Sequence, residues 1–479
     1  MSKMLSWRME PAQTNPLPFL RPQAAGQGRR ARHAQGMALR GHTARACHGA
    51  WQAPPGRADP VGVLVAQGQQ RIQDLLPVRY ARMLASPFAF LRGAAAVMAA
   101  DLAHTPAAGP RVQSCGDCHL ANFGSYASPE GTPVFDINDF DETLSAPFEW
   151  DIKRLGTSLV LAGRQYGLSD GRSRALAVSM ARAYAVEMKR LSRLSPLAVW
   201  ADPIDLSAAI AGFADRRART LARTLLAQRM ESARRHYGLV DTGSGRPALR
   251  EHRPLVMRLP AHDGVIRKAF ARYLATQPAE LAVLLDRYAL RDVIFKVVGI
   301  GSVGTFCAIG LFATADGDML LLQIKEAQQS VLAPFAGPSP FHNQGQRVVT
   351  GQRIMQAQSD IFLGWTHSAG SPDMARDMAD LSGAGRQFYV RRLKDARLAA
   401  IGSDITAEGL PDYAHLYGRT LARAHARSGD SALISGYVGK GNGFSDAIGS
   451  FSVLYADQTK ADWITFRKAV KAGRIVAAG

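Results

Sequence analysis

Six polar side chains suited to phosphate or metal chemistry crowd into 25 residues of the chain. They are Asp117, His119, Asn122, Asp136, Asp139 and Asp141, in the strings C-G-D-C-H-L-A-N-F-G and V-F-D-I-N-D-F-D-E. Carboxylates grouped with an amide oxygen suit a hard cation such as Mg²⁺, which takes oxygen ligands and leaves positions for phosphate and water. An Asp five residues before an Asn can also accept a proton from an incoming hydroxyl. The segment therefore indicates a metal site beside a proton acceptor, although any single acid here could instead cap a turn.

A second group of residues is the string G-I-G-S-V-G with a lysine beyond it. Its members are Gly299, Gly301, Ser302, Gly304 and Lys325. A glycine-rich turn between two strands lets backbone N–H groups approach phosphates, and a Lys on the next strand can reach their oxygens. Dinucleotide binding would require a helix after the glycines, but residues 305–309 have the pattern of a strand. The pattern favours a phosphate-covering glycine turn; the alternative is a plain β-hairpin.

Other chemistry is compatible with the cysteines of the first segment. Cys115, Cys118 and His119 form a C-x-x-C-H string, the attachment pattern of c-type haem, and the two thiols could be half of a zinc site. Haem attachment needs export, and the start of the chain has no apolar run typical of an export signal. Cys47 and Cys307 offer no matching second pair for zinc. We expect His119 to brace the loop by hydrogen bonds.

The first segment resembles the catalytic and metal-binding loops of the protein-kinase-like superfamily, especially aminoglycoside and choline kinases, with their G-D-x-H-x-x-N followed by an acidic stretch. It resembles still more closely a bacterial family known as domain of unknown function 2252. That family's motifs are matched by S-P-F-A-F-L-R-G at 86–93, G-D-C-H-L-A-N-F-G at 116–124, F-D-I-N-D-F-D-E at 135–142 and W-D-I-K-R-L at 150–155. The similarity covers about residues 60–475.

The kinase-like resemblance implies roles for individual residues. Asp117 would be the catalytic base and Asn122 a metal ligand. Asp136, nineteen residues after Asp117, would be the second ligand, with Asp139 and Asp141 as rivals for that position. The implied cofactors are ATP and Mg²⁺.

The order of these motifs is reversed relative to a conventional kinase, in which the glycine loop and lysine precede the catalytic loop. We therefore expect an α+β, two-lobed, protein-kinase-like fold that is circularly permuted and has a largely helical larger lobe. A second departure concerns the helix predicted over 343–358, which contains no Asp or Glu to pair with Lys325. Glu326 or Asp360 could substitute, or the lysine could lack that partner.

Four segments are expected to position these residues. Residues 1–55 read as a disordered basic tail, and 56–290 as the lobe that carries the catalytic loop and most helices, including a basic helix over 207–235. Residues 291–395 read as a nucleotide-binding β lobe, and 396–479 as C-terminal helices that pack on the helical lobe. The strands of the β lobe are predicted at 293–298, 305–312, 319–325 and 387–393.

Charge and composition limit the remaining function classes. The 479 residues carry a net charge of +19, which invites a nucleic-acid-binding interpretation. Nine basic and two acidic residues lie in 1–60, and seventeen and seven in 171–260, so the segments with the candidate site are nearly neutral. Four cysteines and no apolar run of membrane-spanning length favour a cytoplasmic protein.

The sequence predicts an ATP- and Mg²⁺-dependent phosphotransferase that acts on an unidentified, small-molecule acceptor. One alternative is a nucleotide-binding pseudokinase, or a kinase-like protein that transfers AMP. Another is a basic nucleic-acid-binding protein, whose affinity would depend steeply on salt and would survive loss of Asp117.

Overall fold

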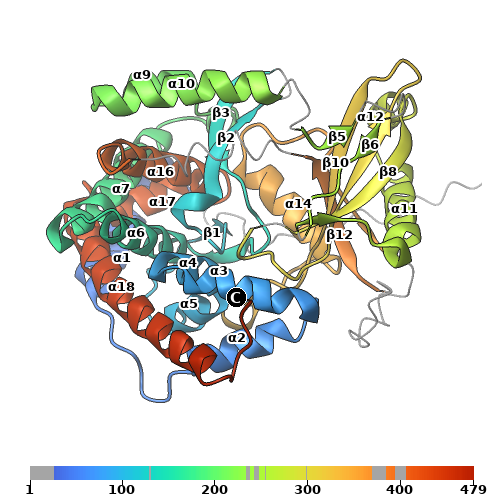
Figure 1. Cartoon of the computed structure of the whole chain (residues 1–479). Coiled ribbons are helices and arrows are strands. Elements are labelled where there is room, and N and C mark those ends of the chain that lie inside the picture. Colours follow the sequence, from blue (N-terminus) through green and yellow to red (C-terminus); the bar gives the residue numbers. More distant parts are fainter. Residues whose placement is uncertain are drawn as a thin grey trace, which may run out of the picture.

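The architecture is mixed α+β, as the sequence predicts. A computed structural model describes residues 26–128, 131–233, 238–241, 247–253, 255–297, 299–368, 385–393 and 406–478. Most helices gather on one side of the molecule, and an antiparallel sheet with its own helices lies on the other (Figure 1). Among the described residues, no helix combines the length and apolar character needed to cross a bilayer.

The helical part is built around helix α7, which packs against three other long helices. Side-chain caps start two of these helices: Ser169 accepts a hydrogen bond from the N–H of Arg172 at the start of α7, and Asp430 accepts from the N–H groups of Ala432 and Leu433 at the start of α17. Helix α6 is buried along almost its whole length, so its polar residues face other protein groups and not water. The helices are α6 (Phe148–Gln165), α7 (Asp170–Leu191), α16 (Leu410–Ala426), α17 (Ser431–Val438) and α18 (Asn442–Lys471).

The prediction that residues 1–55 form a disordered tail is wrong for the stretch that begins at Arg29. Helix α1 (Arg29–His42) packs against α17, and Arg32 pairs with Asp430 at 2.7 Å. The two helices approach closely because glycines meet: a Cβ at Gly36 would lie 2.0 Å from the carbonyl oxygen of Leu433. Gly36 is therefore a contact position between the two helices. Residues 1–25 lie outside the described part of the chain.

Short helices lead from α1 to the candidate site. They place three arginines, discussed below, beside the loop that carries Asp117. In chain order they are the 3₁₀ turn η2 (Arg45–Gly49), α2 (Pro60–Gly68), η3 (Gln73–Leu75), α3 (Leu76–Leu84), α4 (Pro87–Gly93) and α5 (Ala95–Leu102).

Two small strand pairs frame the first candidate segment. Strand β1 (Arg111–Ser114) pairs antiparallel with β4 (Leu144–Pro147). Between them, the 3₁₀ turn η4 (Leu120–Asn122) leads into a hairpin of β2 (Phe123–Ala127) and β3 (Pro133–Ile137). Because β2 and β3 are antiparallel, the acidic stretch after β3 lies beside the loop before β2.

The sheet has six antiparallel strands in the order β11-β12-β10-β9-β8-β7. The four strands predicted in this region are confirmed within a few residues, because each is an apolar run bounded by turn residues. The glycine turn joins β8 to β9, and Lys325 lies on β10. The strands are β7 (Val256–Met257), β8 (Ala289–Lys296), β9 (Cys307–Ala313), β10 (Met319–Glu326), β11 (Gly364–His367) and β12 (Gln387–Arg392); β5 (Val240–Asp241) pairs separately with β6 (Ala248–Leu249).

Helices cover this sheet and connect it to the helical part. Helix α11 (Pro260–Ala275) packs on β8 and β11, and α14 (Gln344–Met355) packs on β11 and β12. Phe270 and Tyr273 of α11 are fully buried in the core against this face. The short helices α12 (Ala279–Leu285) and α13 (Ala333–Ala336) complete this region.

The basic helix predicted over 207–235 is two helices. Helix α9 (Leu206–Ala211) ends before α10 (Arg216–Ala233) begins, and α8 (Pro196–Trp200) precedes both. The break occurs because the carboxylate of Asp412 accepts hydrogen bonds from the N–H groups of Ala214 and Asp215. Those donors would otherwise continue a single helix.

Candidate functional site

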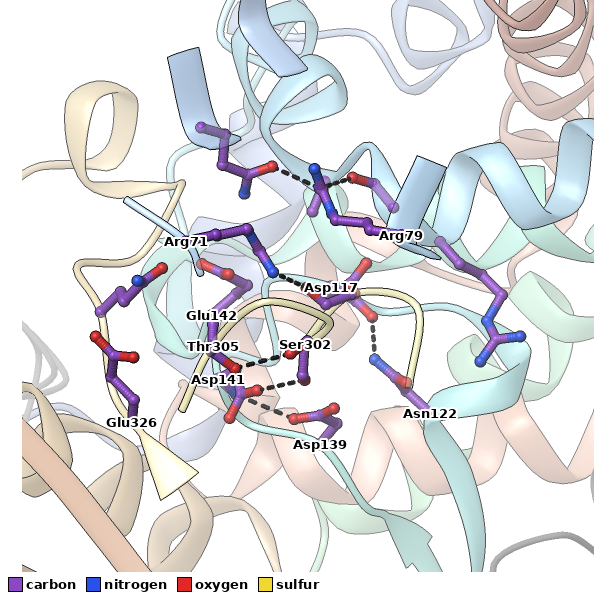
Figure 2. Close-up of a pocket in the computed structure, with 16 residues that line it drawn as sticks. Arg71, Arg79, Asp117, Asn122, Asp139, Asp141, Glu142, Ser302, Thr305 and Glu326 are labelled. Carbon is purple, nitrogen blue, oxygen red and sulfur yellow. Dashed lines mark hydrogen bonds between the residues drawn. The ribbon is translucent and has the colours of Figure 1, made fainter. Parts of the chain in front are cut away.

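Most residues of the two groups singled out in the sequence line a pocket with two adjoining parts, which share residues such as Asp117 and Gly301; Figure 2 shows one of these parts. Asp117, Asn122 and Asp139 come from the segment around the β2–β3 hairpin, and Gly301 and Ser302 come from the turn between β8 and β9. Gly299 and Lys325 line the same region. Residues about 180 positions apart in the chain therefore share a site, as the sequence interpretation required.

Asp117 is held by an arginine of helix α6. Arg154 donates to Oδ1 of Asp117 from Nε at 2.8 Å and again from Nη2. The second oxygen, Oδ2, lies 3.6 Å from Nε2 of His119 and faces the glycine turn, since a Cβ at Gly301 would lie 3.6 Å from it. One carboxylate oxygen is thus fixed by Arg154, and the other borders the pocket.

Asp151, three residues before Arg154 on the same face of α6, anchors the backbone of this loop. Its carboxylate accepts hydrogen bonds from the N–H groups of Cys115 at 2.7 Å and Gly116 at 3.0 Å, and lies 3.2 Å from Nε2 of His425. Sequence reasoning noted the W-D-I-K-R-L motif without assigning these roles. The available signal was the pair of opposite charges at i and i+3, on a helix whose following turns are rich in apolar residues.

Asn122 and Asp139 offer oxygen atoms to the pocket. The amide nitrogen of Asn122 donates to the carbonyl of Asp117 at 2.7 Å, so Oδ1 is the atom left for a ligand. Burial, together with the neighbouring Asp141 carboxylate, raises the pKa of Asp139. Within the described residues, no three His, Cys, Asp or Glu side chains are grouped as a complete metal site. A cation bound here would need further oxygens from a ligand or water.

Asp136, the first choice for the second metal ligand, does not line the pocket. Its carboxylate forms an ion pair with Arg423 of α16, and both side chains are buried. The position along the chain explains the difference: Asp136 lies within β3, which is buried from its second residue onward, while the loop after β3 carries Asp139 and Asp141 to the pocket.

Lys325 has a carboxylate partner, but it is neither of the two considered from sequence. Its Nζ lies 2.8 Å from Asp141 and 3.9 Å from Asp139. Asp141 also accepts hydrogen bonds from the hydroxyls of Ser302 at 3.0 Å and Tyr389 at 2.7 Å. Burial opposes both charges, yet the pair outweighs it: the pKa of Asp141 falls to about 2 and that of Lys325 rises well above its ordinary value.

The expected substitutes for this partner are engaged elsewhere. Glu326 pairs with Arg386 at 2.6 Å, and Asp360 accepts hydrogen bonds from the N–H groups of Phe362 and Arg392. Helix α14, the predicted helix without acids, instead supplies Arg347, which donates to the carbonyls of Asp141 and Thr143. This helix therefore fixes the acidic loop that pairs with Lys325.

The glycine turn is tied down by an arginine that the sequence did not single out. Nη1 of Arg71 donates to the carbonyls of Gly301 at 2.8 Å and Val303 at 2.6 Å. Gly304 has φ of 90°, and a Cβ there would approach Arg71 to 2.9 Å, so a glycine is required. The next element is strand β9, and no helix follows the turn as dinucleotide binding would require.

The cysteines beside Asp117 are buried free thiols. Burial raises the pKa of Cys118 well above its ordinary value, and Cys115 is also shifted upward. Burial lowers the pKa of His119 to about 3, so this side chain is neutral and packs against Phe88. The environment favours a structural role for all three.

Comparison with known proteins places the chain in context. The family model described as an uncharacterized protein conserved in bacteria (DUF2252) matches residues 71–469. No curated protein and no solved structure matches the chain.

Proposed function

We propose that this chain, which belongs to the bacterial DUF2252 family, is an ATP- and Mg²⁺-dependent phosphotransferase with a circularly permuted, two-lobed, kinase-like fold. The acceptor is an unidentified small molecule with a hydroxyl group. One observation carries the proposal: Asp117, Asn122 and Asp139 line the same pocket as the glycine turn and Lys325. Kinase-like phosphoryl transfer needs this combination, whatever the order in the chain.

The nucleotide would lie against the glycine turn. Backbone N–H groups of residues 299–302 can approach the phosphates, and Lys325 supplies a buried ammonium at their edge. Gln323 and Arg391 line the same part of the pocket and add donors. This division of roles matches the chemistry of a triphosphate, which needs several donors and positive charge.

Oxygen ligands for Mg²⁺ would come from Asn122 and Asp139. An amide oxygen and one carboxylate fit this hard cation, which completes its shell with phosphate oxygens and water. When bound, Mg²⁺ neutralises charge on the phosphates. Asp141 is already paired with Lys325 and Asp136 with Arg423, so neither is assigned to the metal.

Asp117 would act as the proton acceptor. Arg154 fixes Oδ1 and leaves Oδ2 toward the pocket. The acceptor hydroxyl oxygen forms a bond to the γ-phosphorus as the bond to the β–γ bridging oxygen breaks. Its proton passes to Oδ2 of Asp117, and ADP leaves.

The sheet supports the kinase-like interpretation. A glycine turn joins two antiparallel strands, the lysine lies on the following strand, and helix α14 packs beside the same sheet. The departure is that the lysine's partner lies on the acidic loop and not on the helix. Phosphoryl transfer and AMP transfer would use the same pocket, so the experiment must distinguish them.

The test incubates the full chain with Mg²⁺ and ATP that carries its label on the α- or the γ-phosphate, together with candidate hydroxyl compounds. We expect release or transfer of the γ-label, and a loss of about 10²–10⁴-fold in Asp117→Asn with Mg²⁺·ATP binding retained. Asp316→Asn, at an exposed turn, is the matched control. Transfer of the α-label would replace phosphoryl with AMP transfer. Absence of nucleotide binding, hydrolysis and transfer in the wild type would overturn the proposal.

A further inference from the structure

One wall of the pocket contains three arginines that the proposed chemistry leaves without a role. Arg71 precedes η3, Arg79 lies on α3 and Arg92 on α4, and all three line the part of the pocket next to Asp117. Arg79 has no exposed surface and Arg71 is 8% exposed. Charged side chains are rarely buried to this extent unless a partner compensates them.

No carboxylate of the described residues lies within ion-pair distance of these three guanidinium groups. Several of their buried nitrogens also lack a hydrogen-bond acceptor: Nε of Arg71, Nε and Nη1 of Arg79, and Nε of Arg92. The hydrogen bonds that Arg71 and Arg79 do make go to neutral acceptors, such as the carbonyls of Gly301 and Gly93. Buried donors in such a state are costly to the fold.

Two acids near Arg71, Glu142 and Glu326, make their hydrogen bonds and ion pairs with other groups. Glu142 accepts a hydrogen bond from the N–H of Val331 at 2.7 Å, and Glu326 pairs with Arg386. Burial lowers the pKa of all three arginines, to about 9 for Arg79, where Arg71 adds repulsion. Burial thus disfavours the charged form of these guanidinium groups, and an incoming anion that accepts hydrogen bonds from their unpartnered nitrogens would offset that cost.

Two of the three arginines, Arg71 and Arg79, lie apart from the place assigned to the nucleotide, and Arg92 borders both parts of the pocket. Lys325, Gln323 and Arg391 line one part of the pocket, whereas Arg71 and Arg79 line the other. Asp117, Asn122 and Asp139 border both parts. Figure 2 shows Arg71 and Arg79 on one side of Asp117, and Asp139 and Asp141 on the other. A molecule bound at Arg71 and Arg79 would therefore reach Asp117 from a different part of the pocket than a triphosphate beside Lys325.

We propose that Arg71, Arg79 and Arg92 form a subsite for a phosphate group of the acceptor, so that the substrate is a phosphorylated compound with a free hydroxyl. The identification of this group as part of an acceptor rests on the proposed phosphotransferase function. Guanidinium forks suit phosphate oxygens, which accept several charge-assisted hydrogen bonds at once. Because Arg71 also holds the carbonyls of the glycine turn, binding at this subsite would help to order that turn.

The experiment titrates inorganic phosphate into the full chain, alone and saturated with Mg²⁺ and a non-hydrolysable ATP analogue, and follows the heat of binding. We expect one phosphate per chain to bind in both states, and at least ~10-fold weaker binding in Arg92→Gln and Arg79→Gln. Arg92 is the less buried residue, so its variant remains informative if Arg79→Gln does not fold. Arg217→Gln, exposed on α10, is the control.

Two results would overturn the subsite. Phosphate binding that is absent, or equal in wild type and both arginine variants, would show that the arginines hold no anion. Competition between phosphate and the ATP analogue would assign the arginines to the nucleotide and not to an acceptor. Arginine-dependent phosphate binding by a chain that binds no nucleotide would instead overturn the phosphotransferase proposal and leave the anion site standing, so the two failures are distinguishable.

Discussion

At the scale of single residues, the pocket separates acids that look equivalent in the sequence. Asp139 and Asp141 are two residues apart, yet only Asp141 makes the close contact with Lys325, while Asp139 faces the pocket with 35% of its side chain exposed. Breaking a buried ion pair leaves an uncompensated charge, whereas neutralising a crowded carboxylate does not. Replacing Asp141 should therefore lower the free energy of unfolding more than replacing Asp139 does.

We predict that Asp141→Asn lowers the free energy of unfolding by about 2–4 kcal/mol, because Lys325 loses its closest partner. Asp139→Asn should change it by less than about 1 kcal/mol but weaken binding of the Mg²⁺-bound ATP analogue by ~10-fold or more. Urea denaturation and calorimetric titration measure the two quantities. Equal destabilisation by both substitutions would contradict the assignment.

Motifs in the sequence identified Asp117, Asn122 and Asp139, because each lies in a short string whose chemistry is local. The arginines could not be found in this way. Arg154 acts on a residue 37 positions away and Arg71 on one 230 positions away. In an arginine-rich chain, nothing local distinguishes them from surface residues.

At the scale of elements, helix α1 shows how composition can mislead. Gly36 is a contact residue, because a Cβ there would meet the backbone of α17; conversely, a Cβ at Gly436 of α17 would lie 2.1 Å from the carbonyl oxygen of His33 in α1. Gly41 lies in the same helix with nothing within 4 Å of its Cβ position. Substitution of Gly41 therefore serves as the control for substitution of Gly36.

We predict that Gly36→Ala lowers the free energy of unfolding by about 1–3 kcal/mol, since the two helices must move apart. Gly41→Ala should instead raise it by up to about 1 kcal/mol, because alanine favours the helix. Thermal and chemical denaturation of the full chain compare the two. A Gly36→Ala variant as stable as Gly41→Ala would show that α1 does not pack on α17.

The first turn of α6 contains a buried acid with a pH-dependent effect on stability. Burial raises the pKa of Glu149 to about 7. The folded protein therefore favours the protonated form of Glu149. The stability that comes from this preference is fully present below the ordinary pKa of Glu, and it is lost as the pH rises to about 7. Nearby His48, with a pKa lowered by burial to about 3, is already neutral across most of this window.

We predict that Glu149→Gln, which keeps an acceptor for the N–H of Ala108, becomes more stable relative to wild type between pH 4.5 and 7. The difference should grow by up to about 3 kcal/mol. Lys153, whose pKa burial lowers to about 8, titrates above this range. Denaturant unfolding at several pH values measures the difference, and a constant difference would refute the prediction.

At the scale of the whole molecule, the sequence predicted the strands of the sheet and the helix over 343–358 to within a few residues, because their patterns are local. The contacts between these elements could not be predicted from the sequence. The pairing of Lys325 with Asp141, and of Asp136 with Arg423, depends on contacts between distant segments that no spacing encodes. The net charge of +19 likewise does not mark this pocket: no described residue of helices α9 and α10 in the basic segment lines it, while three arginines from elsewhere do.

The central claim is that segments 115–142 and 299–326 form one nucleotide site. Hydrogen exchange of the full chain with and without the Mg²⁺-bound ATP analogue tests it most directly, because protection is read separately for each segment. The account predicts slower exchange in residues 299–305 and in 117–122 together, with the effect on both lost in Lys325→Met. Unchanged exchange in both segments, or protection confined to another part of the described chain, would contradict it.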